Sequence, residues 1–187
     1  SMLSQFSEEM GMGFTDPMTS ATNGAQLSLD TMALQARNET ADVGIDVAMG
    51  DGGIKATVSV TNKTGHRLPS GVGFRRIFLE VKATSKDGKT IWCSGCSNDA
   101  GVIVDMDGEP LKTEFLDHVP QGQKQAVYQP HHTVIDSPSQ VQIYEELTQN
   151  AERAFTTSFV HRVYHPKDNR LPPKGSLKPG TPEFIAK

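Results

Sequence analysis

The chain lacks the features of several common protein classes. Two cysteines among 187 residues, Cys93 and Cys96, are too few for a scaffold held together by disulfides. No apolar run approaches the roughly 20 residues that a membrane-spanning helix needs. The net charge of −4 gives no support to a basic nucleic-acid-binding surface. The length is nevertheless sufficient to bury a substantial hydrophobic core.

Standard catalytic signatures are also missing. The sequence contains no G-x-S-x-G elbow, no phosphate-binding Gly-Lys-Ser/Thr loop and no G-x-G-x-x-G fingerprint. Glu145 and Glu146 are neighbours and would point to opposite faces of a strand, which does not suit paired acid–base catalysis. The sequence therefore favours a chain without intrinsic catalysis.

Alternation of apolar and polar residues is the main structural signal. It extends over 43–49 and again, as a half-buried strand, over 54–61, with a turn at 51–53 between them. Further strands are predicted at 77–84, 90–92, 126–135, 141–147 and 154–164. A single sizeable helix is predicted at about 26–41. About seven strands with one helix favour a mainly β fold, specifically an immunoglobulin-like antiparallel β-sandwich.

Two parts are expected along the chain. Residues 1–42 would form an N-terminal arm and the helix, and residues 43–187 a β-sandwich domain with a C-terminal tail. In the strand at 77–84, Ile77 and Leu79 are expected to face inward and Phe78 outward. The tail after His165 is rich in Pro, Lys and Gly, and we expect it to wrap the surface.

The run WCSGC at 92–96 is the most conspicuous local motif. A redox-active pair of this spacing needs its first cysteine at a helix N-terminus, but the residues after Cys96 predict a turn and a strand. Covalent haem attachment would need histidine at position 97, where Ser97 stands, and a zinc site would need a second ligand pair. A local disulfide or two unreactive thiols are favoured, while half of a metal site and an active redox pair stay open.

Basic residues mark two candidate binding segments. His66 and Arg67 lie in a loop rich in Gly and Pro, where binding residues concentrate on a rigid scaffold, although a structural role is equally open for His66. Arg75 and Arg76 begin a strand, so their side chains are expected on opposite faces. Either arginine could bind a carboxylate bidentately, but an internal salt bridge is favoured.

Several segments together resemble a known family. The run TNKTGHRLPSG at 61–71 is followed by FRR at 74–76, by the hairpin residues 87–95, by QVQIYE at 140–145 and by KDNRLPPKG at 167–175. Over about residues 55–175, this pattern resembles the haem-free β-sandwich region downstream of the haem segments in bacterial multihaem c-type cytochromes. The core GHRLPSG is the most specific part of the resemblance.

The resemblance implies a non-catalytic module of a periplasmic or extracellular electron-transfer protein. Because the sequence has no Cys-x-x-Cys-His motif, haem c would be held by an upstream segment of the same polypeptide or by a partner cytochrome. The matching segments supply the cofactor-facing candidates, although the pattern itself assigns no haem contact to them: His66, Arg67, Arg75, Arg76, Asn169 and Arg170. An oxidising compartment would also favour a disulfide between Cys93 and Cys96.

Two other functions stay open. One is a thiol/disulfide redox protein that uses Cys93 and Cys96, which would require accessible cysteines and a lowered thiol pKa. The other is a stand-alone β-sandwich that binds a metal or a glycan. No bound metal, transmembrane segment or nucleic-acid partner is expected for this chain.

Overall fold

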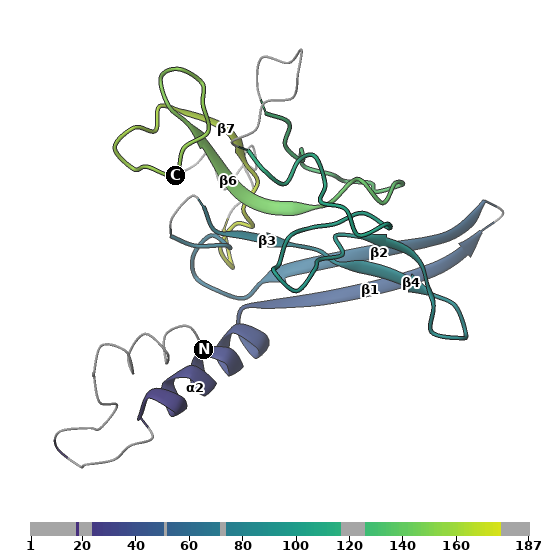
Figure 1. Ribbon diagram of the computed structural model, residues 1–187. Coiled ribbons are helices and arrows are strands. Elements are labelled where there is room, and N and C mark those ends of the chain that lie inside the picture. Colours follow the sequence, from purple (N-terminus) through teal and green to yellow (C-terminus); the bar gives the residue numbers. More distant parts are fainter. Residues whose placement is uncertain (1–17, 19–23, 51, 72–73, 117–125, 177–187) are drawn as a thin grey trace. The chain divides into compact units, whose positions relative to one another are not determined.

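The computed structural model describes residues 18, 24–50, 52–71, 74–116 and 126–176 (Figure 1). Within these residues the fold is mainly β with antiparallel pairing, as the sequence predicts. The elements are α2 (Gly24–Asn38), β1 (Ala41–Gly50), β2 (Gly53–Asn62), β3 (Arg76–Phe78), β4 (Val81–Thr84), β5 (Thr90–Ser94), β6 (Ile143–Gln149) and β7 (Tyr164–Asp168). The chain forms two compact units, the first from 1–65 with 173–187 and the second from 66–172.

The first unit contains α2 and the β1–β2 hairpin. The two strands pair in unbroken register from Ala41 opposite Asn62 to Gly50 opposite Gly53, and Gly53 has a φ of 123°. The helix and the hairpin turn therefore form close to their predicted positions. The half-buried strand predicted at 54–61 is confirmed only at its end, where Val58 and Val60 are half-buried, because the residues from 54 to 57 are exposed on both faces.

The second unit contains a sheet of order β3-β6-β7 and a β4–β5 hairpin. The single strand predicted at 77–84 is divided between them, since β3 pairs with β6 whereas β4 pairs with β5. At the break, the N–H of Leu79 donates to the carbonyl of Gln142 at 3.1 Å. The outward placement predicted for Phe78 is wrong, because this side chain packs against the hydrophobic core.

Two predicted strands do not form. Residues 126–135 are irregular, and side-chain amides replace the ladder of a sheet there: Gln142 Oε1 accepts from the N–H of His132 at 2.7 Å. Residues 154–163 are also irregular, apart from one bridge between Phe155 and Gln149. The prediction that the tail after His165 wraps the surface is wrong for its first residues, because they belong to β7, which pairs with β6. The last residues of the tail, 177–187, lie outside the described part of the chain.

A small hydrophobic core organises the second unit. Ile103, Leu111, Val141 and Ile143 are buried together. Gly95 lies beside this core with a φ of 74°, and a Cβ atom there would come within 2.2 Å of the carbonyl oxygen of Leu79. Only glycine fits this position, so the turn after β5 is fixed against the core.

Candidate functional site

The structure brings together two of the sequence segments that carry the family resemblance. Leu68 and Leu171 form a reciprocal backbone bridge, in which the N–H of Leu68 donates at 2.9 Å and the N–H of Leu171 at 2.8 Å. The bridge places the loop with His66 and Arg67 against the residues that follow β7. Four of the six candidate residues therefore lie in one region, although about 100 positions separate the two segments.

Ion pairs link the side chains of this region into an arginine cluster, consisting of Arg67, Glu146, His165, Asp168 and Arg170. Arg67 Nη1 donates to Asp168 Oδ2 at 2.8 Å. Arg170 donates to both oxygens of Asp168, from Nε at 2.8 Å and from Nη2 at 2.9 Å. Arg170 Nη1 also lies 3.2 Å from Glu146 Oε2, and His165 Nδ1 lies 2.9 Å from Glu146 Oε1. Two carboxylates thus hold two guanidinium groups and one imidazole.

The two arginines of the cluster differ in exposure. The side chain of Arg170 is 15% exposed and bound on both edges, whereas that of Arg67 is 54% exposed. Within the described residues, Nη1 is the only atom of the Arg67 guanidinium with a hydrogen-bond partner. Arg67 therefore presents free donors at the surface, while Arg170 serves to orient Asp168.

Hydrogen bonds and charges within the cluster shift the pKa values of Asp168 and Arg170. The hydrogen bonds from Arg170 lower the pKa of Asp168, and the charge of Arg67 acts in the same direction. The same hydrogen bonds raise the pKa of Arg170. Asp168 is therefore ionised over the whole neutral range, where its carboxylate holds both arginines.

A buried ion pair supports the cluster from the sheet. Lys167 Nζ donates to Glu145 Oε1 at 2.8 Å, and the two side chains are only 5% and 10% exposed. Burial lowers the pKa of Lys167, against the opposing effect of the Glu145 carboxylate. Asn169 is a structural member of this network, because its Oδ1 accepts from the N–H of Glu145 at 3.0 Å and its Nδ2 donates to the carbonyl of Ile143 at 2.8 Å.

Arg75 and Arg76 have other partners. Arg76 forms a two-pronged ion pair with Glu114, whose side chain is 4% exposed, so the internal salt bridge favoured from the sequence is present. Arg75 Nη1 donates to the carbonyl of Ser70 at 3.3 Å. The sequence could not identify Glu114 as the partner, because 38 positions separate it from Arg76 and no local pattern connects them.

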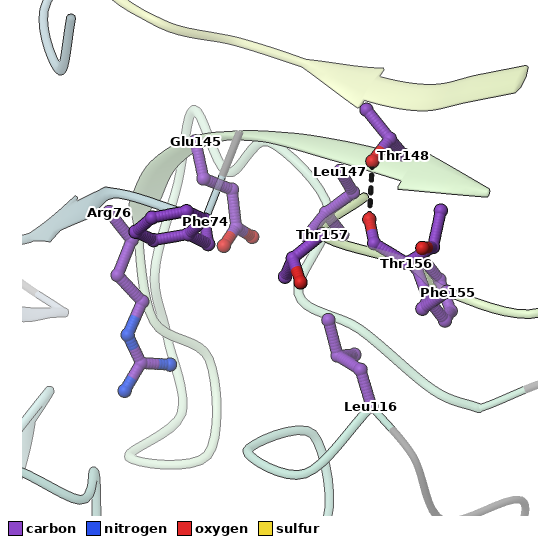
Figure 2. Close-up of a pocket in the computed structure, with 9 residues that line it drawn as sticks. All are labelled: Phe74, Arg76, Leu116, Glu145, Leu147, Thr148, Phe155, Thr156 and Thr157. Atoms are coloured by element: carbon purple, nitrogen blue, oxygen red, sulfur yellow. Dashed lines mark hydrogen bonds between the residues drawn. The ribbon is translucent and has the colours of Figure 1, made fainter. Parts of the chain in front are cut away.

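A pocket of about 520 Å³ lies beside β6, and nothing in the sequence pointed to it. Figure 2 shows Glu145, Thr157 and Leu116 around the same space. Its lining residues are Phe74, Arg76, Leu116, Glu145, Leu147, Thr148, Phe155, Thr156 and Thr157. Thr148 Oγ1 donates to the carbonyl of Thr156 at 2.5 Å, which fixes one wall. Both charged residues already have partners in the chain, so the pocket suits an uncharged ligand better than an ion.

Cys93 and Cys96 form a disulfide where β5 leads into the following turn. Cys93 is 4% exposed and belongs to a strand, so the disulfide lacks the helix N-terminus that an active redox pair needs. The hydroxyl of Ser94 between them donates to the carbonyl of Gln140 at 2.6 Å. The disulfide therefore lies in a well-bonded turn, an environment that suits a structural crosslink.

The described residues contain neither a metal-binding cluster nor a membrane-spanning helix. Among them, no three His, Cys, Asp or Glu side chains are grouped closely enough to hold a metal ion. No helix in the described ranges is long and apolar enough to cross a membrane. Comparisons with models of protein families, with curated proteins and with solved structures gave no match.

Proposed function

We propose that this chain is a haem-free, non-catalytic module that packs against haem-bearing segments of its own polypeptide or of a partner cytochrome, in the periplasm or outside the cell. In this proposal the described sheets of the second unit belong to an immunoglobulin-like β-sandwich. The observation that carries it is the arginine cluster, where the loop of His66 and Arg67 meets the segment of Asn169 and Arg170. These two segments are among those on which the resemblance to the cytochrome region is based.

The chemistry of Arg67 suits this role. A guanidinium group binds a carboxylate through parallel hydrogen bonds, and the propionates of haem are carboxylates. Arg67 keeps free donors at the surface, while its hydrogen bond to Asp168 holds its position. Arg170 in turn orients Asp168. A protein wall against a haem edge also lowers the local dielectric and changes the reduction potential, which supports electron transfer without catalysis in this chain.

The disulfide supports the proposed compartment. Disulfides persist in the periplasm and outside the cell, where the redox environment is oxidising. The pair Cys93 and Cys96 is bonded in the structure. A structural disulfide in this turn fits a periplasmic or extracellular module better than it fits a thiol enzyme.

A haem measurement tests the proposal directly. The complete native gene would be expressed in a host that matures c-type haem, and a pyridine haemochrome spectrum would count haems per chain. We expect a c-type α-band and a changed midpoint potential of one haem in Arg67→Gln. Arg162→Gln is the matched control, because Arg162 is exposed and lies over Phe159 instead of in the cluster. A spectrum without a haem band would overturn the proposal that the haems belong to the same polypeptide.

The pocket favours a second candidate, a β module that binds a glycan. Sugar rings stack their C–H faces on aromatic side chains, and the lining contains Phe74 and Phe155. The hydroxyl of Thr157 and the carboxylate of Glu145 could bond sugar hydroxyls without displacing an ion. The aromatic rings and the polar groups of the lining thus match an uncharged, polar ligand.

Ligand-observed NMR with a panel of neutral saccharides tests this candidate. We expect saturable binding that disappears in Thr157→Phe, because the ring would fill the pocket from its exposed side. Thr133→Phe is the matched control, since Thr133 is also an exposed loop residue but does not line the pocket. Equal binding by the two variants would remove the pocket as the binding site.

A further inference from the structure

One face of the β1–β2 hairpin is apolar from the pair Val43 and Val60 to the pair Met49 and Ile54. The register places eight side chains on this hairpin face: Val43, Ile45, Val47, Met49, Ile54, Ala56, Val58 and Val60. The opposite face carries the charged and hydroxyl side chains, including Asp46 opposite Thr57. The hairpin is therefore strictly two-sided, with one apolar and one polar surface.

The hairpin face is open to solvent in the single chain. Val43, Ile45, Val47, Met49 and Ile54 are between 59% and 83% exposed. An isolated two-stranded hairpin is marginally stable in water, and it normally needs a further layer against its apolar face. Contiguous exposed apolar surface of this kind is typical of protein–protein interfaces.

The area of the hairpin face suits a dimer. A Val, Ile or Met side chain removes on the order of 100 Å² of apolar surface from water when it is buried. The five most exposed side chains therefore bring about 500 Å² per copy, or about 1,000 Å² for two copies, which is the size that a specific interface must reach.

The composition of the face points to a second copy as its occupant. The face carries no charged side chain with which to recognise a charged partner, and two apolar sheet faces pack against each other about 10 Å apart. Such a contact is isologous and closes on itself as a two-fold dimer. The polar face, with Asp46 and Lys55, stays in water and stops further stacking. We propose that two copies of this chain form a dimer by stacking their hairpin faces.

This dimer is independent of the haem-facing role. It uses the first unit of the chain, whereas the arginine cluster lies entirely in the second. A failure to dimerise would leave the haem measurement unaffected, and a protein without haem could still dimerise. The two proposals therefore fail separately.

Sedimentation velocity of the full chain over a series of micromolar concentrations tests the dimer. We expect a reversible dimer for the wild type and for Thr57→Lys, and a monomer for Val47→Lys. Both variants add one lysine near the middle of the hairpin, but Val47 lies on the apolar face and Thr57 on the polar face. Burying a charge at the centre of the interface should raise the dissociation constant by about 30-fold or more.

A second measurement separates loss of the interface from loss of the hairpin. In wild type and Thr57→Lys, amide hydrogen exchange of β1 and β2 should slow as the protein concentration rises, because dimerisation stabilises the hairpin. A wild-type chain that stays monomeric, or exchange that is independent of concentration, would overturn the proposal. Equal dimerisation of the two lysine variants would also overturn it.

Discussion

The two units of this chain use similar secondary structure with opposite outcomes in burial. All buried hydrophobic side chains of the described residues belong to the second unit: Leu68, Cys93, Ile103, Leu111, Ala126, Val141, Ile143, Tyr144 and Leu147. The described first unit has a complete helix and a complete hairpin, yet its buried residue is the polar Asn62. Paired strands thus occur in both units, whereas among the described residues buried apolar side chains occur only in the second.

Two strands make the contrast sharpest. β2 has a clear alternating pattern and is mostly exposed, whereas β6 has the polar sequence IYEELTQ and is buried at every residue. β6 is the centre of a three-stranded sheet, in which β3 pairs with its residues 143–145 and β7 with its residues 146–149, and its side chains are buried on both faces. Burial in this chain therefore follows the position of a strand in its sheet more closely than it follows the pattern of the strand.

The largest expected effect is the loss of stability when the buried ion pair of the second unit is broken, compared with the exposed ion pair of the first. Glu145→Gln leaves Lys167 buried without its partner, and we expect a loss of about 3–5 kcal/mol in the free energy of unfolding. Asp42→Asn breaks the exposed pair with Lys63 in the first unit and should cost about 0–1 kcal/mol. Urea titration followed by fluorescence of Trp92, which is the only tryptophan and lies in the second unit, measures the first loss, and backbone circular dichroism follows both variants. Equal losses would contradict the difference between the units.

Paired truncations of isoleucine test the core itself. Ile103 is fully buried, so Ile103→Ala should cost about 2–5 kcal/mol. Ile54 is 71% exposed, and Ile54→Ala should change the unfolding free energy by less than about 0.5 kcal/mol when the chain is dilute enough to be monomeric. The same urea titrations measure both variants. A large loss for Ile54→Ala at high dilution would show that its own chain covers the hairpin face.

Two glycines with positive φ provide a finer comparison. Ala at position 95 would strain the backbone and would also place its Cβ against the carbonyl of Leu79, whereas Ala at position 53 would meet no atom within 4 Å. We therefore expect Gly95→Ala to be more destabilising than Gly53→Ala by about 1–3 kcal/mol. Thermal unfolding followed by circular dichroism compares the two variants. A cost of Gly53→Ala equal to that of Gly95→Ala would show that the close approach to Leu79 contributes nothing.

The smallest expected effect is a change in acid sensitivity. Arg170 lowers the native pKa of Asp168 below its ordinary value of 3.8, so ionised Asp168 stabilises the fold fully above that value. This contribution is lost as the pH falls from 3.8 through the lower native pKa. Asp168→Asn should therefore flatten the acid limb of the stability curve, measured by urea titration at a series of pH values.

Arg170→Gln is the control for this titration. It removes the hydrogen bonds that are the main cause of the lowered pKa of Asp168, and it should flatten the same limb. An acid limb that neither variant changes would show that Asp168 does not contribute to the acid sensitivity of the second unit.

Local patterns predicted the elements that depend on neighbours in the chain. The helix, the β1–β2 turn and the β4–β5 hairpin form where composition and alternation place them. The strands predicted at 126–135 and 154–164 fail, because Gln side chains and single bridges satisfy the backbone there. Alternation alone does not distinguish a strand with a pairing partner from an extended segment without one.

The candidate site was predictable only in part. The basic residues of two segments were identified, but nothing in the sequence indicated that Arg67 and Arg170 share Asp168, or that Arg76 is bound to Glu114. The pocket beside β6 was missed altogether, since its nine lining residues come from several separate segments. Such sites exist only after distant segments have been paired.

The sequence by itself determined the mainly β fold, the hairpin turns and the two-sided character of β1 and β2, because these depend on residues only a few positions apart. Only the tertiary structure decided that the polar strand β6 is buried and that much of the apolar face of β2 is exposed. It also decided that loop 66–71 lies against the residues after β7. The physical reason is that burial and ion pairing depend on which segments meet in space. A period of two residues fixes the face of a side chain, but the surrounding sheets fix whether that face meets water.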